Sequence, residues 1–456
     1  MKKRLLALFL VLGMCTGLVA CSGSSKKEEK KESSSDGGEV VVSIATLNNP
    51  IVSNLVKLSQ EYYKEEGVKL DFAVLPENDL REKATLEAST GGTTYDIYFT
   101  GPYEANFWIN YGWAENLQPY IDKMTDEQKE SLDIDDIFPS MMDSLSDPKT
   151  GDVYALPFFG EASFFMYNKE LLSEAGVTMP ENPTWDDIYQ IATAVNDDAA
   201  GITGMTMRGA PGWGMSGAPF MTIINAMGGK FYDMDWNATV ETDEQRAAWE
   251  MYKKILRDAG QDDIITYTYN ECISLMNSGK CGIWYDATSN GPNLEANDSL
   301  IKGKVGYAQS PSGWLWNWGM NINPNSSDEK KQAAFDFMVW ACSKDYVNLS
   351  LEKDPSGAST PSGVRASTYE LDAYKDLPYA QPTLDALSRL DFKHPCKDEV
   401  PYVGLQYIAI PEFQEAGDKM TEALAAYVTD EVTLDDALAK TQKAFEAAAQ
   451  EGGYKK

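Results

Sequence analysis

Short apolar runs with strand character recur along this chain and alternate with amphipathic segments. The runs are VVVSIA from Val40, KLDFAVL from Lys69, YDIYF from Tyr95 and CGIWY from Cys281. Several amphipathic segments begin with a capping-box signal, a Ser or Thr followed three residues later by Gln, Asp or Glu. These signals start at Thr125, Thr184, Thr242, Ser326 and Thr433. Strands that alternate with helices predict an α/β architecture with largely parallel sheets.

The length, charge and histidine and cysteine content of the chain limit the classes of function that it can have. At 456 residues it is too long for one compact core, so two lobes are expected. The formal net charge of −31 repels phosphate backbones, which excludes nucleic acid as a partner. One histidine, His394, argues against metal sites and hydrolytic mechanisms that use several imidazoles. The six cysteines form no C-x-x-C pair, which argues against a zinc ribbon.

The N-terminus reads as a bacterial lipoprotein signal over residues 1–20. Three basic residues precede a short apolar run, Leu5–Gly13, that is too short for a permanent membrane helix. The following LVAC, ending at Cys21, resembles a lipobox, in which the cysteine becomes the lipidated first residue. Cys15 is a weaker match because it follows the bulky Met14. Plain secretion, with Cys21 as an ordinary thiol, is the alternative.

Residues 21–39 are predicted to be a flexible linker. The stretch SGSSKKEEKKESSSDGGE is polar and charged, and it has no apolar residues that could be buried to offset the cost of ordering. Hydrophobic alternation begins only at Val40. We therefore expect the folded body to start there, tethered to the extracytoplasmic face of the cell membrane through Cys21.

The ordered set of motifs over roughly residues 95–415 resembles the extracellular solute-binding proteins of ABC sugar importers. The general motifs are TYDIYF, YALPFFGEASFFMYNKELLSEAG, PTWDDI and NSGKCGIWYDAT. A closer resemblance, to the branch that binds sorbitol, mannitol and similar polyols, is carried by RGAPGWG, GGKFYDMDWNATV, WLWNWGMNI, FMVWACSKDY and PYVGLQYIAIPEF.

The resemblance implies a bilobal, type II periplasmic-binding-protein-like fold, with two α/β lobes, a hinge and an interlobe cleft. Lobe 1 would comprise 40–158 and 320–353, and lobe 2 would comprise 162–315 and 365–450. The chain would cross between the lobes at Leu156–Glu161, Trp316–Met320 and Asp354–Arg365. The protein would be a monomer without enzymatic activity, cofactor or metal. It would bind a small polyol or sugar and deliver it to the permease subunits.

A polyol has many hydroxyls, a ridge of C–H groups and no net charge. Its site needs flat apolar faces for the ridge, and carboxylates and guanidinium groups for the hydroxyls. Glu161 lies at the first crossing, and Arg208 lies in a Gly/Pro-rich loop, where a structural salt bridge is the alternative. Asp286 ends a strand and could instead cap the next helix. The candidate ligand residues are Asn48, Tyr103, Glu161, Arg208, Trp213, Asp286, Trp316, Trp318 and Arg365.

Three tryptophans alternate in the stretch GWLWNWG. On an extended strand Trp314, Trp316 and Trp318 point to the same side. The resemblance places Gly319 beside a lobe crossing, so the residues nearest to it can face a ligand. We therefore assign Trp316 and Trp318 to the site and Trp314 to the core.

Other interpretations remain open at this stage. A binding protein for an oligosaccharide or another solute would share the same motifs. An exported glycan-degrading enzyme is disfavoured because the acidic pairs lie in helix-start or surface-like contexts and no G-x-S-x-G motif occurs. Cys272 and Cys281 flank a helix-to-strand turn, and they could form a disulfide or remain buried thiols.

Overall fold

The structure is a computed structural model that describes residues 40–355 and 357–455. These residues belong to one compact unit, Glu39–Lys456. The predicted signal peptide, the linker and Cys21 lie outside the described residues. Within the described ranges, no helix combines the length and the apolar character needed to cross a membrane.

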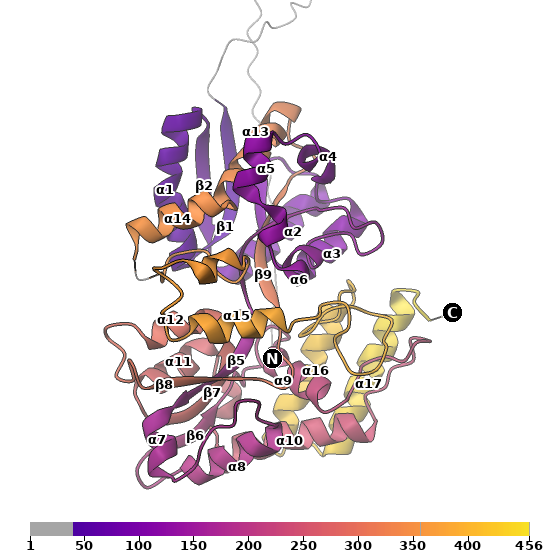
Figure 1. The fold of residues 1–456 in the computed structure, drawn as a ribbon. Coiled ribbons are helices and arrows are strands. Elements are labelled where there is room, and N and C mark those ends of the chain that lie inside the picture. The colour runs from indigo at the N-terminus through magenta and orange to yellow at the C-terminus, as the bar shows by residue number, and fades with distance from the viewer. Residues whose placement is uncertain (1–39, 356, 456) are drawn as a thin grey trace, which may run out of the picture. The chain divides into compact units, whose positions relative to one another are not determined.

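The strands form two sheets, which Figure 1 shows as separate groups. The five-stranded first sheet has the order β2-β1-β3-β9-β4, and the four-stranded second sheet has the order β6-β7-β5-β8. The first sheet contains β1 (Val41–Leu47), β2 (Lys69–Leu75), β3 (Ile97–Thr100), β4 (Leu156–Glu161) and β9 (Trp316–Ile322). The second sheet contains β5 (Ser163–Asn168), β6 (Thr203–Thr206), β7 (Cys281–Ala287) and β8 (Val305–Gln309).

The four apolar runs predicted as strands are confirmed as β1, β2, β3 and β7. The prediction of largely parallel sheets is wrong. Only the pairs β1–β2, β1–β3 and β6–β7 are parallel, whereas β9 is antiparallel to both β3 and β4, and β5 is antiparallel to both β7 and β8. The reason is that β9 enters the first sheet from the opposite direction, after the chain has passed through the second sheet.

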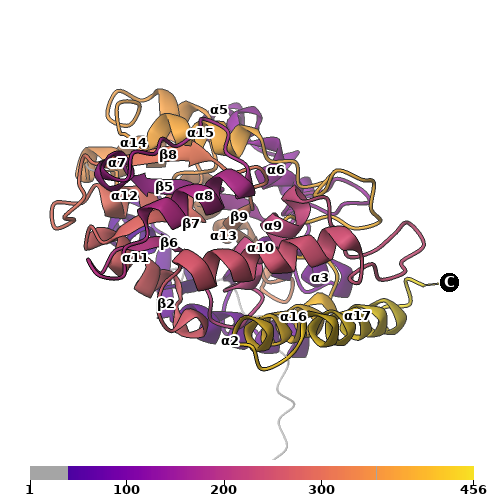
Figure 2. The same ribbon diagram turned by 90° about the horizontal axis from the view of Figure 1, so that it is seen from below.

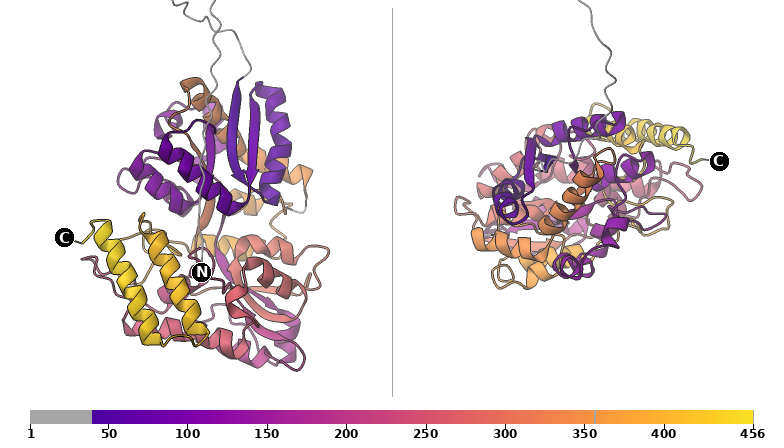
Figure 3. Two further views of the ribbon diagram at one scale, coloured as in Figure 1. Left: turned by 180° about the vertical axis from the view of Figure 1, so that it is seen from behind. Right: turned by 90° about the horizontal axis from the view of Figure 1, so that it is seen from above.

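The helices cover the sheets and fill the connections. Those in the segments that build the first sheet are α1 (Pro50–Glu66), α2 (Glu77–Thr90), α3 (Pro102–Tyr111), α4 (Gln118–Ile121), α5 (Asp126–Leu132), α6 (Pro139–Asp143), α13 (Asp328–Ala341) and α14 (Lys344–Lys353). The others are α7 (Lys169–Glu174), α8 (Trp185–Val195), α9 (Gly217–Ala226), α10 (Asp243–Ala259), α11 (Tyr269–Asn277), α12 (Gly291–Leu294), α15 (Ala380–Ser388), α16 (Phe413–Val428) and α17 (Leu434–Glu451). Helices α16 and α17 run side by side (Figures 2 and 3).

Four of the five predicted helix caps are confirmed. The N-caps of α5, α8, α10 and α17 are the predicted threonines, each accepting a bond from a backbone N–H. The prediction at Ser326 is wrong by one residue, because Ser327 caps α13. The Ser326 hydroxyl instead donates to the buried carboxylate of Asp96, at 2.7 Å.

The chain passes from the first sheet to the second next to the first predicted crossing, and it returns just before the second predicted crossing. Only Ala162 separates β4 from β5, and β9 returns beside β4, with Glu161 opposite Trp316. In the third predicted crossing, the Ser362 carbonyl accepts a bond from the Gly160 N–H at 2.8 Å. Gly363 adopts a positive φ of 79°, and any Cβ there would clash with the Gly160 carbonyl. The first and third crossings are therefore in close backbone contact, while the exact lobe boundaries stay predictions.

Candidate functional site

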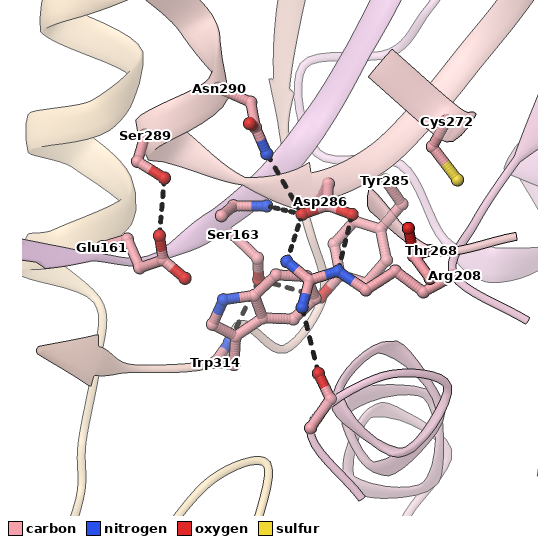
Figure 4. Close-up of polar contacts among 12 residues, drawn as sticks. Glu161, Ser163, Arg208, Thr268, Cys272, Tyr285, Asp286, Ser289, Asn290 and Trp314 are labelled. Carbon is pink, nitrogen blue, oxygen red and sulfur yellow. Dashed lines mark hydrogen bonds and ion pairs between the residues drawn. The ribbon is translucent and has the colours of Figure 1, made fainter. Parts of the chain in front are cut away.

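A buried ion pair lies at the carboxyl ends of β6 and β7. Asp286, in β7, is 0% exposed. Arg208, just after β6, donates to both of its oxygens, from Nε at 2.9 Å and from Nη2 at 2.5 Å (Figure 4). The Asn290 side chain and the Ala287 N–H add bonds to the same carboxylate. Burial lowers the pKa of Arg208, but Asp286 and Glu161 raise it, and the pKa stays above its usual value. Arg208 and Asp286 thus form a bidentate, charge-assisted pair.

Glu161, at the end of β4, is a carboxylate without a cation bonded to it among the described residues. Its Oε2 accepts a bond from the Ser289 hydroxyl at 2.5 Å, and Figure 4 shows its second oxygen pointing away from Ser289. Burial raises the pKa of Glu161 to about 7, although Ser289 and Arg208 lower it. Because Ser289 bonds to only one of the oxygens, the second oxygen is free to accept a hydrogen bond from a hydroxyl of a solute. The raised pKa means that the carboxyl group stays protonated up to near-neutral pH.

Trp314 packs beneath the ion pair. It is 1% exposed, its ring lies 5.3 Å from the Arg208 guanidinium carbon, and the ring of Tyr285 lies 5.3 Å away on another side. Its backbone N–H donates to the Ser163 hydroxyl at 3.0 Å. The strand β9 begins only at Trp316, so Trp314 does not share the alternation of that strand. These contacts give Trp314 a packing role, in line with its assignment to the core.

Three tryptophans form a corner next to this cluster. We call Trp213, Trp316 and Trp318 the aromatic corner. The rings of Trp316 and Trp318 are 5.9 Å apart and nearly perpendicular, at 73°, and Trp213 lies 5.8 Å from Trp316. Behind Trp316 there is no room for a side chain, since a Cβ at Gly101 would clash with its ring. Glu161 is opposite Trp316 in the sheet, so the corner and the ion-pair cluster adjoin.

Arg81 of α2 fills the aromatic corner, and sequence reasoning missed it. Its guanidinium carbon lies 4.8 Å from the ring centroids of both Trp316 and Trp318. Glu77 accepts from its Nε and Nη2, at 3.3 and 3.0 Å, and Glu104 of α3 accepts from its Nη1. Burial lowers the pKa of Arg81, but Glu104 and Glu77 outweigh it and raise the pKa above its usual value. In the sequence, the pair Glu77 and Arg81 has only the i, i+4 spacing of an ordinary surface pair.

Tyr103 of α3 forms a wall of the aromatic corner with its ring, which lies 4.9 Å from that of Trp213. Its hydroxyl donates to the Pro411 carbonyl at 3.0 Å and accepts from the Gln414 N–H at 3.2 Å. The hydroxyl thus bonds to the start of α16. Tyr407, which sequence reasoning also missed, completes the wall at 6.1 Å from Trp316.

Two predicted ligand residues lie outside this arrangement. Asn48 is exposed after β1, and its backbone N–H donates to Leu75. Arg365 is 2% exposed, and its guanidinium donates to the carbonyls of Leu132, at 2.5 Å, and of Cys342. Further donation goes to Asp133 and Asp136. These bonds give Arg365 a structural role at the third crossing, and we leave both residues out of the proposed site.

Cys272 and Cys281 are free, buried thiols. The Cys272 sulfur accepts a bond from the Thr206 hydroxyl at 3.3 Å, and the Cys281 thiol donates to the Ile283 carbonyl at 3.1 Å. Burial raises the pKa of both thiols. Of the two alternatives that the sequence left open, the structure has the buried thiols.

Residues 48–348 match the family described as bacterial extracellular solute-binding protein. The chain belongs to this family, so it acts outside the cytoplasm, and the resemblance inferred from its motifs is confirmed. It is 34% identical over 424 residues to a mannitol-binding protein of Pseudomonas aeruginosa, covering 91% of this chain and 94% of that protein.

Solved structures agree with this assignment. An ABC transporter solute-binding protein from Agrobacterium vitis with bound D-mannitol superposes with a TM-score of 0.82 and 34% identity, covering 91% of this chain and all of that one. Maltose-bound MalE3 of T. maritima, at 19% identity and a TM-score of 0.74 over 90% of this chain and 99% of that one, shares the fold. The bilobal type II fold is confirmed.

Proposed function

We propose that the protein is the lipid-anchored substrate-binding component of an ABC importer, and that it binds a small polyol. The ligand would contact the ion-pair cluster of Glu161, Arg208 and Asp286 and the adjoining aromatic corner. The observation that carries the proposal is the unbonded oxygen of Glu161 beside fixed, charged hydrogen-bonding groups and tryptophan rings. The 34% identity to a mannitol-binding protein over nearly the whole chain supports it.

The chemistry of the site suits a neutral, hydroxyl-rich solute. A carboxylate accepts hydroxyl protons, and charged partners make each hydrogen bond stronger than a neutral one. Arg208 is balanced by Asp286, and Arg81 is flanked by Glu77 and Glu104. Any charge on Glu161 is then surplus, which disfavours an anionic solute. A solute that lacks one expected hydroxyl would leave a buried polar group unpaired, so the site would discriminate between similar polyols.

The proposal is tested by thermal-shift screening of the mature protein, without residues 1–20. We expect mannitol, sorbitol or a related pentitol such as xylitol or arabitol to raise the unfolding temperature, because a ligand that binds only the folded state stabilises it. Monosaccharides and maltose-type sugars complete the panel. Stabilisation by oligosaccharides alone would favour the alternative of an oligosaccharide receptor. Chemical conversion of any of these compounds would contradict a pure binding function.

A further inference from the structure

We propose that Arg81 is a ligand-binding residue that sets specificity, held by Glu77 and Glu104 and donating to hydroxyls of the solute. The inference rests on the proposed function and extends it, because Arg81 comes from α2, far from the ion-pair cluster in the sequence. Three observations support it: the place of the guanidinium over the aromatic corner, the cost of moving it, and its remaining N–H groups.

The guanidinium lies over the tryptophan rings of the aromatic corner. Its central carbon is 4.8 Å from the ring centroids of both Trp316 and Trp318 and 5.9 Å from that of Trp213. Trp318 is 5% exposed, whereas the Arg81 side chain is 20% exposed. A solute that reaches the aromatic corner therefore meets Arg81 in addition to the indole rings.

Arg81 is costly to displace. Glu104 is 5% exposed, so removal of Arg81 would leave a buried carboxylate without a counter-ion. Removing one partner of a buried ion pair is strongly destabilising. The cation–π contacts with the indole rings also hold the guanidinium in place. A neutral polyol supplies no cation to compensate, so Arg81 stays over the rings when the solute binds.

The guanidinium retains donors for a solute. An arginine side chain has five N–H groups in a planar fork. Glu77 accepts from Nε and Nη2, and Glu104 accepts from Nη1. Among the described residues nothing else accepts from Arg81, so each terminal nitrogen keeps one N–H. Two N–H groups on one plane match the two oxygens of adjacent hydroxyls.

The first experiment measures hexitol affinity by calorimetry in Arg81→Met and Arg81→Lys. We expect Arg81→Met to weaken binding of D-mannitol, or of the hexitol that the wild type binds most tightly, by at least ~10-fold. Arg81→Lys, which keeps the charge but loses the fork, should be intermediate. Arg246→Met is the matched control, because Arg246 pairs with the exposed Asp435 away from the site. Unchanged or tighter binding by Arg81→Met would overturn the inference.

A second variant separates binding from folding. If Arg81→Met unfolds because Glu104 is left charged, the double variant Arg81→Met with Glu104→Gln removes both charges. The Gln carbonyl can still accept from the Gly101 N–H, as Glu104 does now. This variant should fold and still bind the hexitol weakly, whereas wild-type affinity in it would contradict the inference.

A double cycle that combines Arg81→Met with changes to the ligand distinguishes a direct contact between Arg81 and the solute from an indirect structural effect of Arg81. Affinities of deoxy-hexitols, each lacking one hydroxyl, are compared in the wild type and Arg81→Met. If Arg81 binds a hydroxyl, at least one deoxy analogue loses less affinity in the variant than in the wild type. Strictly additive losses for all of them would refute the contact. If the wild type binds no polyol at all, the proposed function fails and the inference falls with it.

Discussion

Glu161 has a pKa of about 7, well above that of an ordinary glutamate, because its side chain is buried. It ends β4, accepts one bond from Ser289 and has no cation bonded to it among the described residues. By contrast, Asp286 has a bidentate arginine and further donors. The two carboxyls therefore differ in their electrostatic surroundings, because only Asp286 is paired with an arginine. This difference has a measurable effect on stability.

Glu161→Gln should flatten the dependence of stability on pH. The folded pKa of Glu161 is about 7, above the value of 4.5 for an unperturbed Glu, so the folded protein binds more protons between these limits. Its contribution to stability is fully present below about pH 4.5 and is lost as the pH rises through 7. From about pH 5 to about pH 8, the free energy of unfolding of the variant should rise relative to the wild type, by up to about 3 kcal/mol. Urea unfolding measures it, and parallel curves would contradict the assignment.

At the scale of elements, the first and third crossings are held in close backbone contact. Gly160 and Gly363 approach so closely that the Gly160 carbonyl occupies the place of a Cβ on Gly363. Gly363 also has a positive φ, of 79°. The two glycines therefore let β4 and the third crossing share a bond between the Gly160 N–H and the Ser362 carbonyl.

Gly363→Ala should destabilise the protein far more than Gly67→Ala. Gly67 ends α1 with a similar φ of 71°, but nothing lies within 4 Å of its Cβ position. Gly67→Ala therefore bears only the left-handed backbone penalty, about 1 kcal/mol. Gly363→Ala adds a steric clash with backbone and should cost at least about 2–3 kcal/mol more. Equal losses in urea unfolding would show that the crossing segments can move apart freely.

The helices and strands that have local sequence signals were predictable, whereas the features that were missed depend on contacts between distant residues. Local signals, such as the apolar run from Cys281 and the cap at Thr433, predict β7 and α17 because they depend on neighbouring residues. The direction of β9 depends on pairing between distant segments, which no local pattern encodes. Arg81 was missed for the same reason, since its partner Glu104 lies in a different helix. Arg365 resembled a site residue only by its place in the third crossing.

At the scale of the whole molecule, the strongly negative net charge affects which solutes can approach the site. The formal net charge is −31, and the proposed site itself contains more carboxylates than guanidinium groups. A neutral solute is indifferent to this field, while an anionic one is repelled both in solution and on contact. The protein as a whole therefore adds to the selectivity of its site.

A hexonate, in which a carboxylate replaces one terminal hydroxymethyl group of the hexitol, should bind at least ~10-fold more weakly, a loss of about 1.4 kcal/mol. Above about pH 7, the surplus negative charge of Glu161 opposes the binding of the hexonate, and the net negative charge of the protein adds to the effect. Titration at low and at high salt measures the effect, and salt should reduce the part that comes from exposed charges. Equal affinities for the two compounds would contradict the charge balance proposed for the site.

Cys21→Ser should separate anchoring from binding. The lipid is proposed to be attached at Cys21, outside the folded body, so the variant should be released from membranes into the medium or the soluble fraction. Its hexitol affinity should equal that of the wild type within about 0.5 kcal/mol, because distant sites act independently. Fractionation and calorimetry measure the two properties. Persistent membrane attachment would refute the lipobox assignment.

The order of strands in the first sheet also determines when that sheet can be completed as the chain folds. Strands β3 and β4 never pair with each other, because β9 stands between them. If the chain is exported N-terminus first through the proposed signal peptide, β3 keeps an unpaired edge and β4 has no partner strand until Trp316–Ile322 has followed. A partly exported chain would then carry an incomplete sheet, which favours aggregation. β9, which supplies Trp316 and Trp318 to the aromatic corner, is thus also the strand that joins β3 to β4 and completes the first sheet.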